Sequence, residues 1–394
     1  MSVADPWLAR HGASLVELRR DLHRHPELGH QEHRTTALVL DRLRAAGLEP
    51  RALTSGTGVV CDLGPVGSRT VGLRADLDAL PLNDEKDVPY RSTVTGVCHA
   101  CGHDVHTAIL VGVAQVLAGL ELPGRVRLLF QPAEELMPGG ALDVLAEGLI
   151  DGPGERLDAL YAVHCDPTLE VGRLGVRSGP ITAAADLVQV RLSGPGGHTS
   201  RPHATVDLVQ ALATVATGLP AALSRLVDPR AGLALVWGHI GAGVVANAIP
   251  REGTLLGTLR VLDRTAWASA PDLVRRVVDG LVAPYGAVAD LTYTRGVPPV
   301  VNDVAATAIL AEAATAALGS GAVVPTLQSL GGEDFAWYLE RVPGSMARLG
   351  VRPPGLARPH DLHQGSFDVA EDAIAVGVRV LVAAALAALQ PPAV

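Results

Sequence analysis

The stretch His99-Ala-Cys-Gly-His-Asp-Val-His106 leads into a helical segment, Asp104–Leu120, and the apolar segment Val126–Phe130 then ends at Gln131-Pro-Ala-Glu-Glu135. Thiolate, imidazole and carboxylate groups together are the ligands that zinc-like divalent metals prefer. A hydrolytic metal centre also needs a carboxylate that binds no metal and moves protons instead. The two adjacent glutamates can divide these roles. This stretch therefore predicts a helix and a strand that build the site of a metal-dependent hydrolase.

Short apolar runs alternate with helical segments through the first 180 residues or so. Asp104 is the expected N-cap of the helix that follows it. Buried strands are predicted at Val59–Leu63, Val71–Leu73, Val126–Phe130 and Leu160–Val163. This alternation is typical of an α/β fold with a mainly parallel sheet.

Polar side chains follow three of these strands. Asp76 and Asp78 come after one strand, the paired glutamates after another, and His164 ends a third. Open α/β sheets bind ligands beyond the carboxyl ends of their strands. We therefore expect these side chains to converge.

The pattern changes after about Gly179. Strands and helices are then predicted in the order β-α-β-β-α-β, at Ala185–Leu192, Asp207–Thr217, Leu233–Ile240, Thr254–Leu262, Ala266–Val282 and Val288–Thr294. This order is the ferredoxin-like split motif. It predicts an inserted α+β domain, residues 181–295, between two parts of a catalytic domain, residues 1–180 and 296–394.

Composition excludes several classes of protein. The 394 residues carry a formal net charge of −9 and show no basic patch, which argues against binding to nucleic acid or anionic membranes. The longest apolar run, Ala373–Leu389, is shorter than the ~20 residues of a membrane span and is interrupted by Arg379, so a buried helix is expected. Met1–Pro6 has no secretory pattern, and four cysteines make no disulfide framework. A cytoplasmic location is expected.

Each motif also has a simpler interpretation. Cys98-His-Ala-Cys101 fits a redox pair, although no second C-x-x-C is present for a four-cysteine zinc site. A histidine at a strand end, such as His164, is often only hydrogen-bonded, and His363 lies in a proline-rich loop where exposure is usual. The sequence lacks a G-x-S-x-G nucleophile elbow, an H-E-x-x-H helix and a phosphate-binding G-x-x-x-x-G-K-[ST] loop.

Taken together, the motifs closely resemble the amidohydrolase branch of metallopeptidase family 20, which includes hippurate hydrolases, N-acyl-amino-acid amidohydrolases and auxin-conjugate hydrolases. The resemblance covers essentially the whole chain. The motifs that carry it are Asp21-Leu-His-Arg-His-Pro-Glu-Leu28, Arg74-Ala-Asp-Leu-Asp-Ala-Leu-Pro81, His99-Ala-Cys-Gly-His-Asp104, Gln131-Pro-Ala-Glu-Glu135, Gly196-Gly-His198, Ala246-Asn-Ala-Ile-Pro250, Gly257-Thr-Leu-Arg260 and Gly332-Glu-Asp-Phe335.

The resemblance implies two divalent metal ions in the α/β domain, beneath a ferredoxin-like lid that often mediates homodimer formation. It also implies a small N-acyl amino acid as the substrate. Cysteine, histidine and glutamate together suit zinc, manganese, cobalt or nickel, so the sequence leaves the metal open. The implied metal ligands are Cys101, His103, Glu135, His164 and His363, with Glu134 as the general base. Asp76 and Asp78 are expected to orient the ligands.

On the lid, the resemblance implies that His198, Asn247 and Arg260 bind the substrate. Arg260 would pair with the substrate carboxylate. His198 and Asn247 lie in glycine-rich loops of the same domain and are expected to converge with Arg260, although His198 is also implied to serve a neighbouring subunit.

Two rival functions stay open. One is a dipeptidase or carbamoyl-amino-acid hydrolase. The Cys101-Gly-His103 pattern argues against these relatives, which typically have aspartate at the position that bridges the metals. The other is a protein without catalytic activity that binds a metal or an amino acid. Cys98, where methionine is common, and Cys165 depart from the family pattern and could add sensitivity to oxidation.

Overall fold

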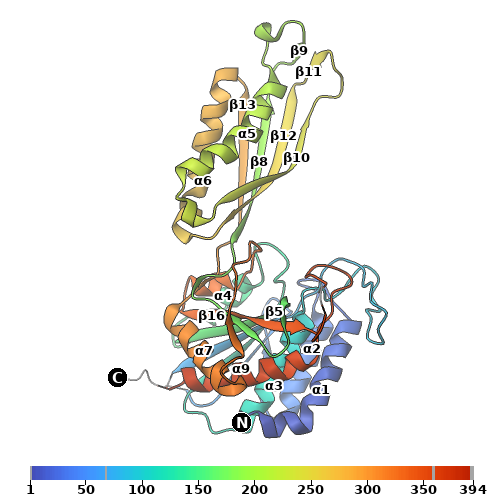
Figure 1. The fold of residues 1–394 in the computed structure, drawn as a ribbon, viewed down its shortest axis with the longest axis vertical. Coiled ribbons are helices and arrows are strands. Elements are labelled where there is room, and N and C mark those ends of the chain that lie inside the picture. The colour runs from blue at the N-terminus through green and yellow to red at the C-terminus, as the bar shows by residue number, and fades with distance from the viewer. Residues whose placement is uncertain (1, 67–68, 357–359, 391–394) are drawn as a thin grey trace. The chain divides into compact units, whose positions relative to one another are not determined.

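The computed structural model describes residues 2–66, 69–356 and 360–390. The two expected catalytic segments, 1–180 and 296–394, also include the few positions outside these ranges. Two compact units are present (Figure 1). Unit 1 comprises Met1–Gly179, Val301–Leu327 and Trp337–Val394, and unit 2 comprises Pro180–Val300 and Gln328–Ala336. Among the described helices, none has the length and apolar character needed to cross a membrane.

Unit 1 is built on a mixed sheet whose centre is parallel. Within the described residues its eight strands run in the order β1-β2-β4-β3-β5-β16-β6-β15. The pairs β4–β3, β3–β5 and β5–β16 are parallel, whereas β2 pairs antiparallel with β4. The strands are β1 (Arg51–Ala52), β2 (Val59–Leu63), β3 (Thr70–Asp76), β4 (Arg125–Gln131), β5 (Ala159–Glu170), β6 (Leu174–Val176), β15 (Val323–Pro325) and β16 (Gly344–Arg352). The expected mainly parallel α/β sheet is confirmed at the strands that matter for the site.

Helices cover this sheet and bury its apolar residues. They are α1 (Asp5–Arg24), α2 (His33–Ala45), α3 (His103–Ala118), α4 (Ala141–Ala146), α7 (Val304–Leu318), α8 (Ala336–Leu339) and α9 (Asp372–Ala388). Helices α3 and α9 pack against each other and against the central strands. Helix α3 is buried on nearly every side, as expected for a helix that is apolar all round. The C-terminal apolar run forms the buried helix α9, as predicted.

The start of α3 differs from the prediction. Gly102, not Asp104, is the N-cap, and no side chain caps the helix. The carboxylate of Asp104 instead accepts hydrogen bonds from Arg19 Nε (2.8 Å) and His23 Nδ1 (2.7 Å), both on α1. The expected cap is wrong because these buried partners hold Asp104 in an ion-paired network between α1 and α3.

Unit 2 has the ferredoxin-like element order. It contains β8 (Ala184–Ser193), β9 (Gly197–His198), α5 (Leu208–Leu226), β10 (Ala234–Ala242), β11 (Ala248–Ile249), β12 (Glu252–Val261), α6 (Arg264–Val282) and β13 (Val288–Val297). Its four-stranded sheet runs β10-β12-β8-β13 with antiparallel neighbours, and α5 and α6 pack together against it. Two short strands, β7 (Gly179–Pro180) and β14 (Val301–Asn302), lie at the ends of this insertion.

One segment packs differently from the expected division. The segment Gln328–Ala336, which the sequence places with the second catalytic segment, belongs to unit 2. Backbone hydrogen bonds explain this, because Ser329 donates to Ile181 (2.9 Å) and accepts from Ala183 (3.1 Å).

Candidate metal centre

Gly102 sets the chain direction at the start of α3. It takes a left-handed conformation with φ of 86°, and a Cβ atom there would lie 2.7 Å from Cys165 Sγ. Glycine is therefore required by conformation and by space. The flanking side chains, Cys101 and His103, are 6% and 0% exposed. This local geometry places a buried thiol and a buried imidazole at the N-terminus of α3.

Residues from other elements approach this thiol and imidazole. Cys101 Sγ lies 3.5 Å from Nε2 of His164 on β5, and Oε1 of Glu135 lies 3.3 Å from Nε2 of His363. Cys101, His103 and His164 each contribute one donor atom to a group in which all atoms lie within 4.8 Å of one another. Cys101, Glu135 and His363 form a second group of the same kind. The five side chains predicted as ligands thus form two overlapping groups that share Cys101.

The two glutamates after β4 flank the imidazole of His103. Oε2 of Glu134 lies 3.9 Å from His103 Nε2, and Oε1 of Glu135 lies 4.0 Å from the same nitrogen. These separations exceed hydrogen-bond distance. A cation between His103 Nε2 and Glu135 Oε1 would contact both atoms, and the carboxylate of Glu134 would lie beside it.

Two buried atoms of the cluster lack hydrogen bonds. Within the described part of the chain, His103 Nε2 and Glu135 Oε1 have no hydrogen-bond partner. Buried polar atoms are nearly always paired, so each exception requires an explanation. A divalent cation explains both, because a nitrogen lone pair and a carboxylate oxygen are suitable ligands. The donor set therefore fits a metal centre.

Asp78 holds two of the predicted ligands. The Nδ1 atom of His103 lies 2.9 Å from the Asp78 carbonyl oxygen and 3.3 Å from Asp78 Oδ1, while Oδ2 accepts the backbone N–H of Glu135 at 2.9 Å. Donation from Nδ1 turns Nε2 toward the centre, where its lone pair can bind a cation that displaces the second ring proton. Such outer hydrogen bonds fix the tautomer and orientation of a ligand histidine.

Asp76 acts through His106, a residue that the sequence motif contains but to which we assigned no role. Oδ1 of Asp76 lies 2.6 Å from Nδ1 of His106, and the backbone N–H of Cys165 donates to His106 Nε2 at 2.9 Å. His106 thus joins β3 to the peptide that follows His164. Nδ1 of His164 in turn lies 2.8 Å from the Cys165 carbonyl oxygen, which turns Nε2 toward Cys101.

Glu32 is a second residue that the sequence did not single out. Its Oε1 atom accepts the backbone N–H of Ala133 at 2.7 Å, and Ala133 has a φ of 53°. This strained residue comes directly before Glu134. No local motif could have revealed this link, since Glu32 lies about a hundred positions away in the chain.

The cluster carries an excess of negative charge. Burial alone would lower the pKa of His103, but Asp76 and Asp78 outweigh it and raise this pKa to about 10. Burial and the two neighbouring glutamates raise the pKa of the Cys101 thiol well above its usual range. Both groups thus keep their protons until a cation replaces them.

The two cysteines of the C-x-x-C motif have different neighbours. Both are free and buried. Cys98 Sγ lies 3.7 Å from Nζ of Lys86, whereas Cys101 Sγ faces His164. This arrangement favours a metal-binding role for Cys101 over a redox pair.

In unit 2, His198 and Asn247 lie together. Strand β9 pairs with β11, which places His198 opposite Ala248, and the backbone N–H of Thr199 donates to the Asn247 carbonyl oxygen at 3.3 Å. Both side chains are exposed. The predicted association of these two residues is therefore present.

Arg260 does not join them. His198 lies in β9 and Asn247 directly precedes β11, which comes just before Glu252, the first residue of β12. Arg260 lies eight positions further along the same strand. At about 3.4 Å per residue, these eight positions span roughly 27 Å. The expected convergence of Arg260 with His198 and Asn247 in one chain is wrong, because an extended strand separates them.

The side chain of Arg260 is only partly engaged. Its Nη1 atom donates to the Leu330 carbonyl oxygen at 3.2 Å, and no carboxylate of a described residue forms an ion pair with it. Burial lowers the pKa of Arg260.

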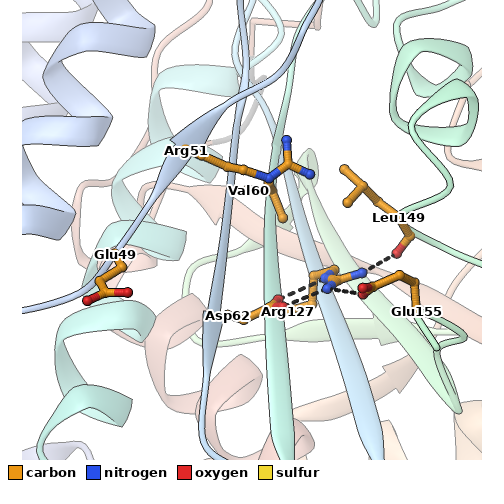
Figure 2. A pocket seen from close by; sticks show the side chains of 7 residues that line it. All are labelled: Glu49, Arg51, Val60, Asp62, Arg127, Leu149 and Glu155. Carbon is orange, nitrogen blue, oxygen red and sulfur yellow. Dashed lines mark hydrogen bonds and ion pairs between the residues drawn. The ribbon is translucent and has the colours of Figure 1, made fainter. Parts of the chain in front are cut away.

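A separate pocket of about 300 Å³ lies over β2 and β4 (Figure 2). Arg127 at its centre donates to both carboxylate oxygens of Asp62, to Glu155 and to the Leu149 carbonyl oxygen. Since this guanidinium is fully paired, the pocket offers no binding group comparable with the unpaired atoms of the metal centre.

Comparisons with known proteins identify several relatives of the chain. A Rhodococcus jostii protein, provisionally named glutamate–cysteine ligase 2-3, is 52% identical over 94% of this chain but only 46% of its own length. The chain therefore spans about half of that relative. An N-acyl-L-amino acid amidohydrolase from Geobacillus stearothermophilus is 38% identical over 73% of this chain and 78% of its own.

A solved structure matches over nearly the full length. It is the YXEP protein of Bacillus subtilis, described as a dinuclear metal-binding peptidase from the M20 family. The match has a TM-score of 0.83 and 33% identity, and it covers 96% of this chain and 98% of that one. The model of peptidase family M20/M25/M40 matches residues 72–387. The chain belongs to this family.

Proposed function

We propose that the protein is a metal-dependent amidohydrolase that cleaves N-acyl amino acids into a carboxylic acid and a free amino acid. The observation that carries this proposal is a cluster of thiol, imidazole and carboxylate groups in which two buried atoms, His103 Nε2 and Glu135 Oε1, form no hydrogen bond within the described residues. Glu135 Oε1 lies 3.3 Å from Nε2 of another predicted ligand, His363. The name of the Geobacillus stearothermophilus relative and the description of the Bacillus subtilis structure support the same chemistry.

Five side chains would hold two divalent ions. These are Cys101, His103, Glu135, His164 and His363, and Asp76 and Asp78 would keep them in place through the hydrogen bonds described above. Zinc, manganese, cobalt and nickel all suit this mixture of donors. Bound ions would lower the pKa of a water molecule and polarise the acyl carbonyl group.

Glu134 would serve as the general base. The Glu134 carboxylate accepts a proton from water while the water oxygen bonds to the acyl carbon. It then gives that proton to the amine nitrogen as the C–N bond breaks. Its side chain is 8% exposed, and Oε2 lies 3.9 Å from His103 Nε2. This position beside a ligand imidazole suits a base that must reach water at the metal centre.

The direct test is release of a free amino acid. We expect the purified protein to hydrolyse at least one of a panel of N-acetyl, N-benzoyl and N-indoleacetyl amino acids, to lose this activity with a chelator and to regain it with one of the four metals. Dipeptides and N-carbamoyl amino acids complete the panel. Turnover of these alone would contradict the proposal in favour of the rival hydrolases.

Arg260 would bind the substrate carboxylate, since its guanidinium has no carboxylate partner among the described residues. Arg260→Ala should cost roughly 2–5 kcal/mol of transition-state binding for N-acyl amino acids, by loss of a charge-assisted bond. The loss should be small for the corresponding amino-acid amides, which lack the carboxylate. Arg260→Lys should restore activity only partly, because lysine lacks the planar fork. An alanine variant with the wild-type preference for carboxylates over amides would rule out this role.

His198 and Asn247 would contribute to the site of a second copy of the chain. These two residues lie at one end of β12, and Arg260 lies roughly 27 Å away near the other end. One small substrate cannot bridge this distance. A homodimer or larger homo-oligomer formed through unit 2 would supply the three residues from different copies.

A further inference from the structure

Arg348 is unlike the other buried arginines of this chain. Five arginines of the described residues are buried, and Arg348 is 8% exposed. The other four form ion pairs, with Asp104 (Arg19), Asp76 (Arg74), Glu155 (Arg125) and Asp62 (Arg127). Across residues 2–66, 69–356 and 360–390, no side-chain hydrogen bond or ion pair of Arg348 is present.

This arginine lies beside the metal centre. On β16 it is the register partner of His164 on β5, in a parallel pair. Paired residues of neighbouring strands point to the same face of a sheet, and the strands are about 4.8 Å apart. Burial first, and then the charge of Arg348, lower the pKa of His164. The guanidinium therefore lies within reach of a group bound at the metal centre.

The charge on Arg348 needs an anion. A guanidinium keeps its proton in proteins, so it cannot escape burial by becoming neutral. An unpaired buried charge is strongly unfavourable, and nearby divalent ions would increase the repulsion. The carboxylates of Asp76, Glu134 and Glu135 do not reach it within 4.0 Å. No nitrogen of Arg348 is among the fully buried atoms of the described residues that lack a partner, so an anion that enters from solvent can reach this guanidinium.

We propose that Arg348 binds a second carboxylate of the substrate, so that the enzyme prefers N-acyl amino acids that carry two carboxylates. This inference rests on the proposed amidohydrolase function. The planar fork of Arg348 suits a bidentate bond with a carboxylate. That second carboxylate belongs either to the acyl group, as in an N-succinyl substrate, or to the side chain of aspartate or glutamate.

Three substrates separate these sources. N-acetylalanine carries one carboxylate, N-succinylalanine carries a second on the acyl group, and N-acetylglutamate carries a second on the side chain. With the metal-loaded full-length enzyme, Arg348→Gln should lower kcat/KM by roughly 30-fold or more for one dianionic substrate and little for N-acetylalanine. The substrate that suffers identifies the source. Arg348→Lys should restore part of the loss.

Arg352→Gln is the matched control. Arg352 lies on the same strand but is 3.7 Å from Glu170, so its charge is already paired, and its replacement should leave the substrate ratios unchanged. The proposal would be overturned if Arg348→Gln lowered kcat/KM equally for all three substrates, or if it left all three values unchanged. Metal content is measured in every variant. If Arg348→Gln loses metal or fails to fold, Arg348→Lys decides. Because lysine lacks the planar fork, kcat/KM should then fall for one dianionic substrate more than for N-acetylalanine, and wild-type ratios would overturn the proposal.

Binding can be measured without turnover. Calorimetric titration of succinate and glutarate, with acetate as the monoanion, should show tighter binding of a dicarboxylate to the wild type than to Arg348→Gln. If no acyl amino acid is hydrolysed but this difference is found, the proposed function fails while the anion site stands. If hydrolysis occurs but the wild type and Arg348→Gln bind both dicarboxylates equally, the proposed function stands and the anion site at Arg348 is ruled out.

Discussion

Replacing Glu134 with glutamine is expected to lower kcat by about 10²–10⁴-fold, the usual contribution of general acid–base catalysis, while the metal content stays at the wild-type level. The amide keeps the shape of the side chain and its ability to hydrogen-bond, but it cannot accept and return the proton of water. Glu134 lies beside His103 and, in our assignment, binds no metal. Turnover and metal content should therefore separate in this variant.

Glu135→Gln is the matched control, since it makes the same chemical change one residue further along the chain. Glu135 lies 3.3 Å from His363 and shares a group of donor atoms with Cys101. This variant should lose metal as well as activity. Elemental analysis and steady-state kinetics measure both quantities, and equal metal loss in the two variants would show that the pair is assigned in the wrong order.

Cys101→Ala is expected to remove the one donor that both groups of ligands share. Its effect on metal affinity should exceed the roughly 10–100-fold that removal of an outer hydrogen-bonding partner costs. Alanine has no donor atom. Cys98 is not expected to take over, because its thiol lies 3.7 Å from Lys86 Nζ and is in neither of the two donor groups described for Cys101.

Cys98→Ala provides the comparison, as it removes a buried thiol of the same motif. This variant should keep its metal and its activity. Metal content unchanged in both Cys101→Ala and His164→Ala would contradict the assigned site. Greater damage in Cys98→Ala than in Cys101→Ala would restore the redox interpretation of the C-x-x-C motif.

Local sequence pattern was sufficient for much of the fold. The strand Val59–Leu63 has the predicted bounds, and the predicted helix and strand around residues 104–130 appear as α3 and β4. The β-α-β-β-α-β order of unit 2 was also readable. Hydrophobic period and turn residues are local properties, and they act over a few positions of the chain. The strand-end part of the cluster, Glu134, Glu135 and His164, was predictable because the ends of adjacent parallel strands share one edge of the sheet. The complete ligand set came from the family resemblance.

The partners of charged side chains depended on tertiary structure. Asp104 looks like a helix cap in the sequence, but packing of α1 against α3 gives its carboxylate to Arg19 and His23. Arg260 and His198 sit in the same domain, yet the length of β12 separates them. The sequence does not distinguish Arg348 from other arginines in strands. The register of β16 with β5 places it beside His164, where no carboxylate of a described residue pairs with it. The sequence by itself determined which chemical groups are present and which elements carry them. Only the tertiary structure decided which groups meet, because strand register and helix packing join residues that no local pattern connects.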